Sequence, residues 1–198
     1  MNGVGVLQLQ HPDGQVFAFE PGSLSLAFAV TGAPHDPERF ETFHVPADLS
    51  RWAASVLDAG DVEASPADLQ RAKRLRTAIW RTVDAAIDRR PLPAADRRVL
   101  NETAIAAPLT PQLRRAGASD WARPVRAAAV LSAVARDAIN VLGGARAARL
   151  KRCQGVNCAI PFVDTSRPGT RRWCSMERCG NRAKARTHYH QHRQEASE

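Results

Sequence analysis

The sequence predicts an α+β protein of two domains. A mostly helical domain with a small β-hairpin component is expected over residues 1–145, and a small cysteine-bearing domain over residues 146–198. Three observations support this: apolar residues recur every three or four positions in several stretches before residue 145, 44% of the chain is hydrophobic, and all four cysteines follow residue 150. A chain of 198 residues suits one medium and one small domain.

The first domain begins with a predicted β-hairpin over Val4–Phe19. Apolar residues alternate on both sides of His11-Pro12-Asp13-Gly14, and Asp-Gly is a strong signal for a hairpin tip. Residues 32–44 contain glycine, prolines and alternating charge, which predicts a surface connection. A second hairpin is predicted over residues 108–124, around a turn at residues 117–120.

The strongest helix prediction runs from Ser65 to Arg90. Ser65 suits the N-cap, Pro66 the first helical position, and Asp68 the first turn, where negative charge meets the positive end of the helix dipole. The expected apolar stripe consists of Leu69, Ala72, Leu75, Ile79, Val83 and Ile87. Arg71, Arg74 and Arg81 lie on the opposite face, as an ordinary solvated surface or as contacts to a nucleic acid.

Three shorter helices complete the first domain. One begins after Pro46 and ends at Gly60, another spans residues 94–107, and the last spans residues 125–142. Trp52 on the first of these has the spacing of a core residue, although a Trp can also stack on a ligand.

The cysteines form two close pairs. The spacing is C-x4-C, fifteen residues, then C-x4-C, made by Cys153, Cys158, Cys174 and Cys179. Each pair can supply two thiolates from one tight turn, which is what a tetrahedral zinc site requires. The segment has too few apolar residues to fold around a hydrophobic core of its own, so one structural zinc ion is expected to form its core.

Other interpretations of the cysteines are two disulfides, unrelated thiols or a redox dithiol. The first ten residues carry no basic residue and no long apolar run, so a reducing cytoplasm is expected, where paired cysteines favour metal. A redox pair typically has the spacing C-x-x-C. His188, His190 and His192 could also bind metal, but four cysteines already complete the shell, so a solvated helix end is expected for them.

Several motifs around the cysteines resemble the CGNR zinc finger. They are Phe162–Arg167, Arg171–Met176, Cys179–Arg182 and Lys184, and the resemblance covers residues 149–193. In that family the finger follows a mostly helical domain called ABATE, in proteins described as stress-induced bacterial transcription regulators, a role that is itself inferred. The resemblance therefore implies an ABATE-like domain over residues 1–145 and a CGNR-type finger over residues 146–198.

The chain departs from that family in the apolar run Ser23–Val30. Where the family tends to have a Leu-Asp-Phe-Val-Asn-Thr signature at a strand or helix start, this chain has Leu-Ala-Phe-Ala-Val-Thr at residues 26–31. Within the finger, residues 160–173 predict a hairpin turning at Pro168-Gly169, and residues 176–194 predict a helix. A knuckle, a hairpin and a ligand-bearing helix resemble a treble clef.

The positive charge lies entirely in the finger segment. Basic and acidic residues are 16 each over residues 1–145, but 12 against 4 over residues 146–198. A basic patch on a neutral body predicts a polyanionic partner, whereas the alternative is a solvated tail. Arg182, Arg186, Tyr189 and Arg193 fall on one helical stripe. The predicted nucleic-acid contacts are Arg171, Arg172, Asn181, Arg182, Lys184, Arg186, Tyr189 and Arg193. For Asn181 a base contact and a brace for the metal knuckle are both open.

The sequence carries no recognisable catalytic motif, and a complete four-cysteine shell leaves no open metal position, so no enzyme is expected. No apolar run approaches the roughly 18 residues of a membrane span. The expected function is a DNA-binding transcription regulator whose N-terminal domain senses or docks something. The alternative is a protein-interaction or RNA-binding adaptor. A homodimer is plausible, since DNA regulators often dimerise.

Overall fold

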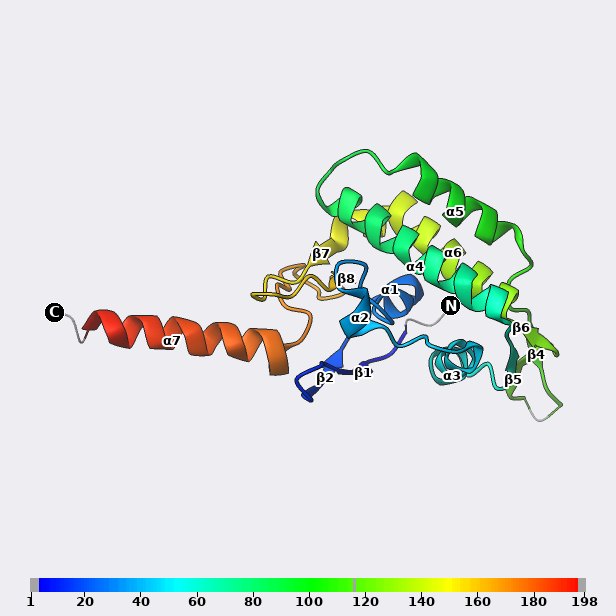
Figure 1. Cartoon of the computed structure of the whole chain (residues 1–198), viewed down its shortest axis with the longest axis horizontal. Coiled ribbons are helices and arrows are strands. Elements are labelled where there is room, and N and C mark those ends of the chain that lie inside the picture. Colours follow the sequence, from blue (N-terminus) through cyan, green and yellow to red (C-terminus); the bar gives the residue numbers. More distant parts are fainter. Residues whose placement is uncertain (1–3, 116, 196–198) are drawn as a thin grey trace.

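Three helices that pack against one another and a projecting C-terminal helix organise the fold (Figure 1). The computed structural model describes residues 4–115 and 117–195, with side chains up to residue 189. The three packed helices are α4 (Pro66–Ile87), α5 (Ala94–Ile105) and α6 (Ala127–Gly143). The last helix, α7 (Asn181–Glu195), extends away from this body. Among the described residues, no helix combines the length and the apolar character needed to cross a membrane.

The start of α4 confirms the predicted capping. Ser65 Oγ accepts from Asp68 N at 3.2 Å, and Asp68 Oδ2 accepts from Ser65 N at 3.0 Å, with Pro66 at the first helical position. This reciprocal pair satisfies two backbone donors that a helix start otherwise leaves unpaired. Every residue of the predicted stripe is buried except the half-buried Ile87, and the stripe packs against α1, α5 and α6.

Three further helices lie beside this layer. They are α1 (Leu24–Ala29), α2 (Pro37–Phe40) and α3 (Pro46–Leu57). The apolar run before residue 30 is α1, and all six of its residues are buried against α4 and α6. The connection over residues 32–44 contains α2, because Asp36 caps it by accepting from Arg39 N and Pro37 sits at its start. Trp52 in α3 packs edge-on against Phe28, with ring centroids 5.0 Å apart, which supports the packing role.

Both hairpins predicted in the first domain are confirmed. The first pairs β1 (Leu7–Gln10) with β2 (Val16–Phe19), in the register Leu7 to Phe19. The second pairs β4 (Pro111–Leu113) with β5 (Ser119–Trp121). A short parallel pair, β3 (Val62–Glu63) with β6 (Val125–Arg126), joins segments far apart in the chain and was not predicted. The α+β fold class is confirmed.

The predicted finger hairpin over residues 160–173 is wrong. The strand β8 (Pro161–Val163) pairs instead with β7 (Leu150–Arg152), which follows the 3₁₀ helix η1 (Ala145–Arg149). The turn at Ser166–Gly169 exists, since Gly169 N donates to Ser166 O at 3.1 Å. Residues 171–173 form no strand; instead, Arg171 N donates to the buried Asp164 carboxylate at 2.9 Å.

The β7–β8 pair contacts two separate hydrophobic cores. Leu150 and Val163 are cross-strand partners and belong to the large helical core. Phe162 belongs to a second core, which contains Cys153, Cys174 and Cys179 together with Phe17 and Phe19 of β2. Successive strand residues point to opposite faces, so one three-residue strand joins both cores.

Candidate metal centre and nucleic-acid interface

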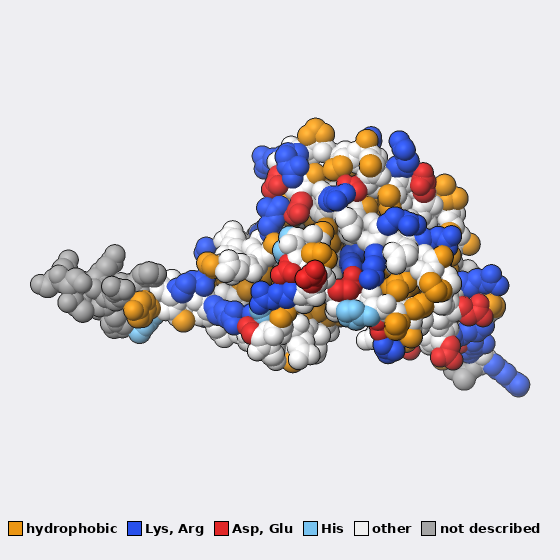
Figure 2. Space-filling view, viewed as in Figure 1, with side chains coloured by type: hydrophobic (Ala, Val, Ile, Leu, Met, Phe, Trp, Pro, Cys, Tyr) orange, Lys and Arg blue, Asp and Glu red, His pale blue; other side chains and the backbone are white. Residues whose placement is uncertain are grey.

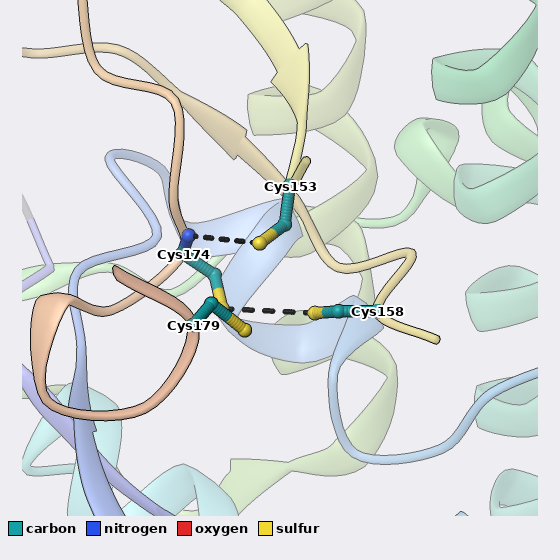
Figure 3. A group of neighbouring side chains, drawn as sticks. All are labelled: Cys153, Cys158, Cys174 and Cys179. Atoms are coloured by element: carbon teal, nitrogen blue, oxygen red, sulfur yellow. Dashed lines mark hydrogen bonds between the residues drawn. The ribbon is translucent and has the colours of Figure 1, made fainter. Parts of the chain in front are cut away.

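The four predicted cysteine ligands converge on one point (Figure 3). Their Sγ atoms all lie within 4.8 Å of one another, and Cys174 Sγ is 3.7 Å from both Cys158 Sγ and Cys179 Sγ. Cys153 follows β7 directly, and Cys179 lies in the π-helical turn η2 (Met176–Gly180). Three of the thiols are buried, while that of Cys158 is half-buried.

This geometry fits one tetrahedral zinc ion. Zn–S bonds of about 2.3 Å place neighbouring sulfurs of a tetrahedron about 3.8 Å apart, close to the two observed distances. Four thiolates fill the shell, so the ion is structural. The pKa of the Cys174 thiol is raised, first by the neighbouring Cys153 and then by Cys158 and Cys179. A divalent cation stabilises the deprotonated thiolates instead, and zinc binding therefore releases protons.

The backbone of the first knuckle supports the sulfurs. Cys153 N donates to Ile160 O at 3.0 Å, and Cys158 N donates to Gly155 O at 3.1 Å. Asn157 adopts the left-handed conformation with φ of 59°, which asparagine tolerates well. Gly155 N and Cys174 N both donate to Cys153 Sγ, at 3.4 and 3.3 Å. Such donors stabilise the thiolate form and orient it toward the metal.

A buried carboxylate organises the loop that precedes the second cysteine pair. Asp164 Oδ2 accepts from Lys151 Nζ at 2.7 Å and from Arg171 N at 2.9 Å, while Oδ1 accepts from Ser166 N and Oγ. Burial alone would raise the pKa of Asp164, but the Lys151 and Ser166 hydrogen bonds hold it below its ordinary value. The Asp-Thr-Ser sequence therefore fixes the path of the chain from β8 to Cys174.

Arg178 is a structural residue of the finger that sequence reasoning missed. It is 5% exposed, and its guanidinium donates to Asp13 Oδ2 at 2.8 Å and to Gln15 Oε1 at 2.6 Å. Its Cζ also lies 5.6 Å from the centroid of the Phe17 ring. These contacts attach the β1–β2 hairpin to the finger. An arginine beside the last cysteine has no spacing signal that distinguishes this role.

The two parts of the chain match two family models in the expected order. The ABATE model, described as "Putative stress-induced transcription regulator", matches residues 22–145. The chain belongs to the ABATE family. The CGNR zinc finger model matches residues 149–192, which confirms the predicted finger. No curated protein sequence matches the chain. The β1–β2 hairpin precedes the ABATE match, yet it packs on the CGNR finger.

The predicted nucleic-acid residues of this ABATE-family chain fall into two groups. Arg171 is engaged internally: its guanidinium donates to Trp173 O and Glu20 O, and lies 4.3 Å from the centroid of the Phe162 ring. Arg172 is exposed, donates to Gln154 Oε1 at 2.7 Å and lies over the Trp173 ring. Both of these arginines, in the loop before Cys174, therefore make contacts within the protein.

The second group lies on α7, which projects from the body (Figure 2). Asn181, Arg182, Lys184, Arg186 and Tyr189 are all exposed, and Tyr189 is 60% exposed. Arg182 also donates to Asp13 Oδ2 at 3.1 Å. Among the described residues, the Asn181 side chain has no hydrogen-bond partner, so nothing shows it bracing the knuckle. Arg193, His190 and His192 lie beyond the described side chains, and the exposed His188 is not part of the cysteine cluster.

Proposed function

We propose that this ABATE-family protein is a zinc-dependent, DNA-binding transcription regulator without catalytic activity. One observation carries the proposal: an exposed basic helix, α7, is anchored by the zinc centre and projects from a body whose charges balance. Arginine binds phosphate or guanine through two parallel hydrogen bonds, and a projecting helix can enter a major groove. The N-terminal helical domain would then sense or dock a second component.

Support for DNA as the partner comes from the charge distribution. The finger segment carries 12 basic against 4 acidic residues, and Arg182 and Arg186 lie one turn apart on the exposed surface of α7. Four thiolates on zinc remove about two units of that charge, which leaves the segment strongly basic. Phosphate contacts of this kind position a protein, and the exposed Asn181 and Arg182 at the start of α7 could contact bases.

A second candidate is a protein-interaction or RNA-binding adaptor. Exposed apolar side chains on the finger favour it, since Val156 is 65% exposed and Met176 is 51% exposed. Single exposed apolar residues are normal on a protein surface. At a protein interface, Val156 and Met176 would instead form one apolar patch together with Tyr189. A protein partner at an apolar interface would bind with weak salt dependence, whereas RNA would show the strong salt dependence of phosphate contacts.

The first test is selection of the zinc-loaded protein against a random duplex pool, followed by a salt series on the enriched sequence. The double variant Arg182→Ala with Arg186→Ala should weaken binding and reduce the slope of log K against log salt by about one for each lost phosphate contact. Its zinc content should equal that of the wild type.

The matched control removes two exposed arginines of α5, Arg97→Ala with Arg98→Ala. This control changes net charge equally and should leave the salt slope unchanged. Equal loss in both variants would mean that general charge attracts DNA, and no enrichment at all would refute sequence-specific binding.

A further inference from the structure

An open cavity of about 950 Å³ lies where the N-terminal domain meets the zinc finger. Most of its lining comes from three segments, which are the β1–β2 hairpin with its tip, the connection between α1 and α3, and the finger at its first knuckle and around the start of α7; Trp80 of α4 also lines it. In Figure 1, α2 and the hairpin lie beside the base of the finger at this junction. Its size falls in the range of small-molecule sites.

One wall of this cavity is a cluster of rings. The His11 and Phe40 rings meet edge-on at 5.8 Å, and the His35 ring lies 6.2 Å from Phe40 and 5.8 Å from Trp80. Burial and then Arg178 lower the pKa of His11, which keeps its imidazole neutral near neutral pH. Such a wall suits the flat apolar face of an aromatic ligand.

Two of the three carboxylates that line the cavity are already paired with arginines. Glu41 accepts from Arg76 Nη1 and Nη2 at 2.8 and 2.7 Å, and Asp13 accepts from Arg178. The third, Asp36, accepts one hydrogen bond from Arg39 N at 3.4 Å and has no cationic partner among the described residues. The negative charge of Asp13 and Glu41 is therefore offset within the protein.

The remaining lining arginines are not compensated in this way. Among the described residues, no carboxylate pairs with Arg39 or Arg186, and Arg182 shares Asp13 with Arg178. These guanidiniums come from α2 and from α7, so they border the cavity from opposite domains. Their field favours an anion between them.

We propose that this cavity binds a small organic anion with an aromatic body, its acidic group held by Arg39 and Arg186 and its ring placed against His35 and Phe40. The role of this site in regulation rests on the proposed function. In a regulator, the anion in the cavity would be the ligand that the N-terminal domain senses. Arg182 and Arg186 also belong to the proposed DNA surface. An anion held there competes with phosphate, and by reciprocity DNA weakens the binding of the anion by the same factor.

The test uses the full-length, zinc-loaded protein and a fluorescent aromatic sulfonate, 8-anilinonaphthalene-1-sulfonate. We expect saturable fluorescence that 2-naphthoate displaces and the neutral 2-naphthamide displaces at least about tenfold less well, because it lacks the charge. Arg39→Gln should weaken naphthoate about tenfold. Ala159→Phe should abolish binding by filling a lining position. The control Arg51→Gln changes an exposed residue of α3 outside the cavity and should match the wild type.

Equal displacement by naphthoate and naphthamide would overturn the proposal, and so would unchanged naphthoate affinity in both cavity variants at wild-type zinc content. The readout involves no DNA. A protein that binds naphthoate but fails the DNA selection contradicts only the proposed function, and the reverse result contradicts only the cavity.

Discussion

Gly155 lies in the first zinc knuckle and faces Cys179 of the second, where a side chain has no room. A Cβ at this position would come 2.8 Å from Cys179 Sγ and 3.2 Å from Cys158 Cβ. We predict that Gly155→Ala lowers zinc affinity by at least about tenfold, as changes beside a metal shell commonly do. Competition with a chromophoric chelator measures this.

Gly143 at the end of α6 is the matched control, since a Cβ there would meet nothing within 4 Å. Gly143→Ala should leave zinc affinity at the wild-type value. If Gly155→Ala binds zinc as tightly as the wild type does, the two knuckles can move apart, and the close contact between Gly155 and Cys179 does not limit zinc binding.

Glu41 should make the free energy of unfolding of the protein depend on pH in the acidic range. Burial alone would raise its pKa, but the hydrogen bonds from Arg76 and the Phe43 backbone lower it from 4.5 to about 2. Because the pKa is lower in the folded protein, the carboxylate stabilises the fold above pH 4.5, and this contribution disappears as pH falls toward 2. We expect a loss of about 1 to 3 kcal/mol over that interval.

Urea unfolding at a series of pH values measures that loss. Glu41→Gln should remove the acid-dependent part and destabilise the protein at neutral pH, because Arg76 remains buried without its partner. The control Glu38→Gln changes an exposed residue of α2 and should retain the wild-type pH profile. Identical profiles for the wild type and Glu41→Gln would assign the acid sensitivity to other carboxylates.

At the scale of elements, the β1–β2 hairpin should stabilise the zinc finger. Phe17 is 3% exposed and packs in the core that contains three of the cysteines, whereas its neighbour Val16 is 56% exposed. We predict that Phe17→Ala costs about 3 kcal/mol and speeds zinc release. Val16→Ala should change stability by less than about 0.5 kcal/mol.

Urea unfolding and chelator-driven zinc release measure both effects. The comparison is strict because the two residues are adjacent and differ in the face of β2 that they occupy. Equal zinc-release rates in the two variants would show that the finger holds its metal without the hairpin.

Elements with a local chemical signal were predictable from the sequence. Ser65, Pro66 and Asp68 marked the start of α4, and Asp13-Gly14 marked the first hairpin, because caps and tight turns depend on neighbouring residues. The β3–β6 pair joins two dipeptides that are distant in the chain, and no local pattern specifies it. The finger hairpin was mispredicted because its turn is local, whereas the true partner of β8 precedes the first knuckle.

At the scale of the whole molecule, the cysteine site was predictable and its surroundings were not. Ligand spacing follows from the tetrahedral requirement of zinc, so Cys153 to Cys179 could be assigned without a structure. The contacts of Arg178 with Asp13 form only because the finger packs against the β1–β2 hairpin in the folded protein, and no sequence pattern indicates that packing. Arg152 likewise joins the finger to the body by pairing with Asp84 and Asp88 of α4 and its C-cap.

The shared core of hairpin and finger also has a consequence for synthesis of the chain. Asp13 and Arg178 are 165 residues apart, so the ribosome releases the hairpin long before its partner exists. At typical rates of roughly 5–20 residues per second, Phe17 and Phe19 wait about 8 to 33 seconds before the finger residues that cover them are synthesised. During this interval the uncovered phenylalanines can bind chaperones or promote aggregation. The interval ends only when the last cysteine has left the ribosome and the zinc ion is bound.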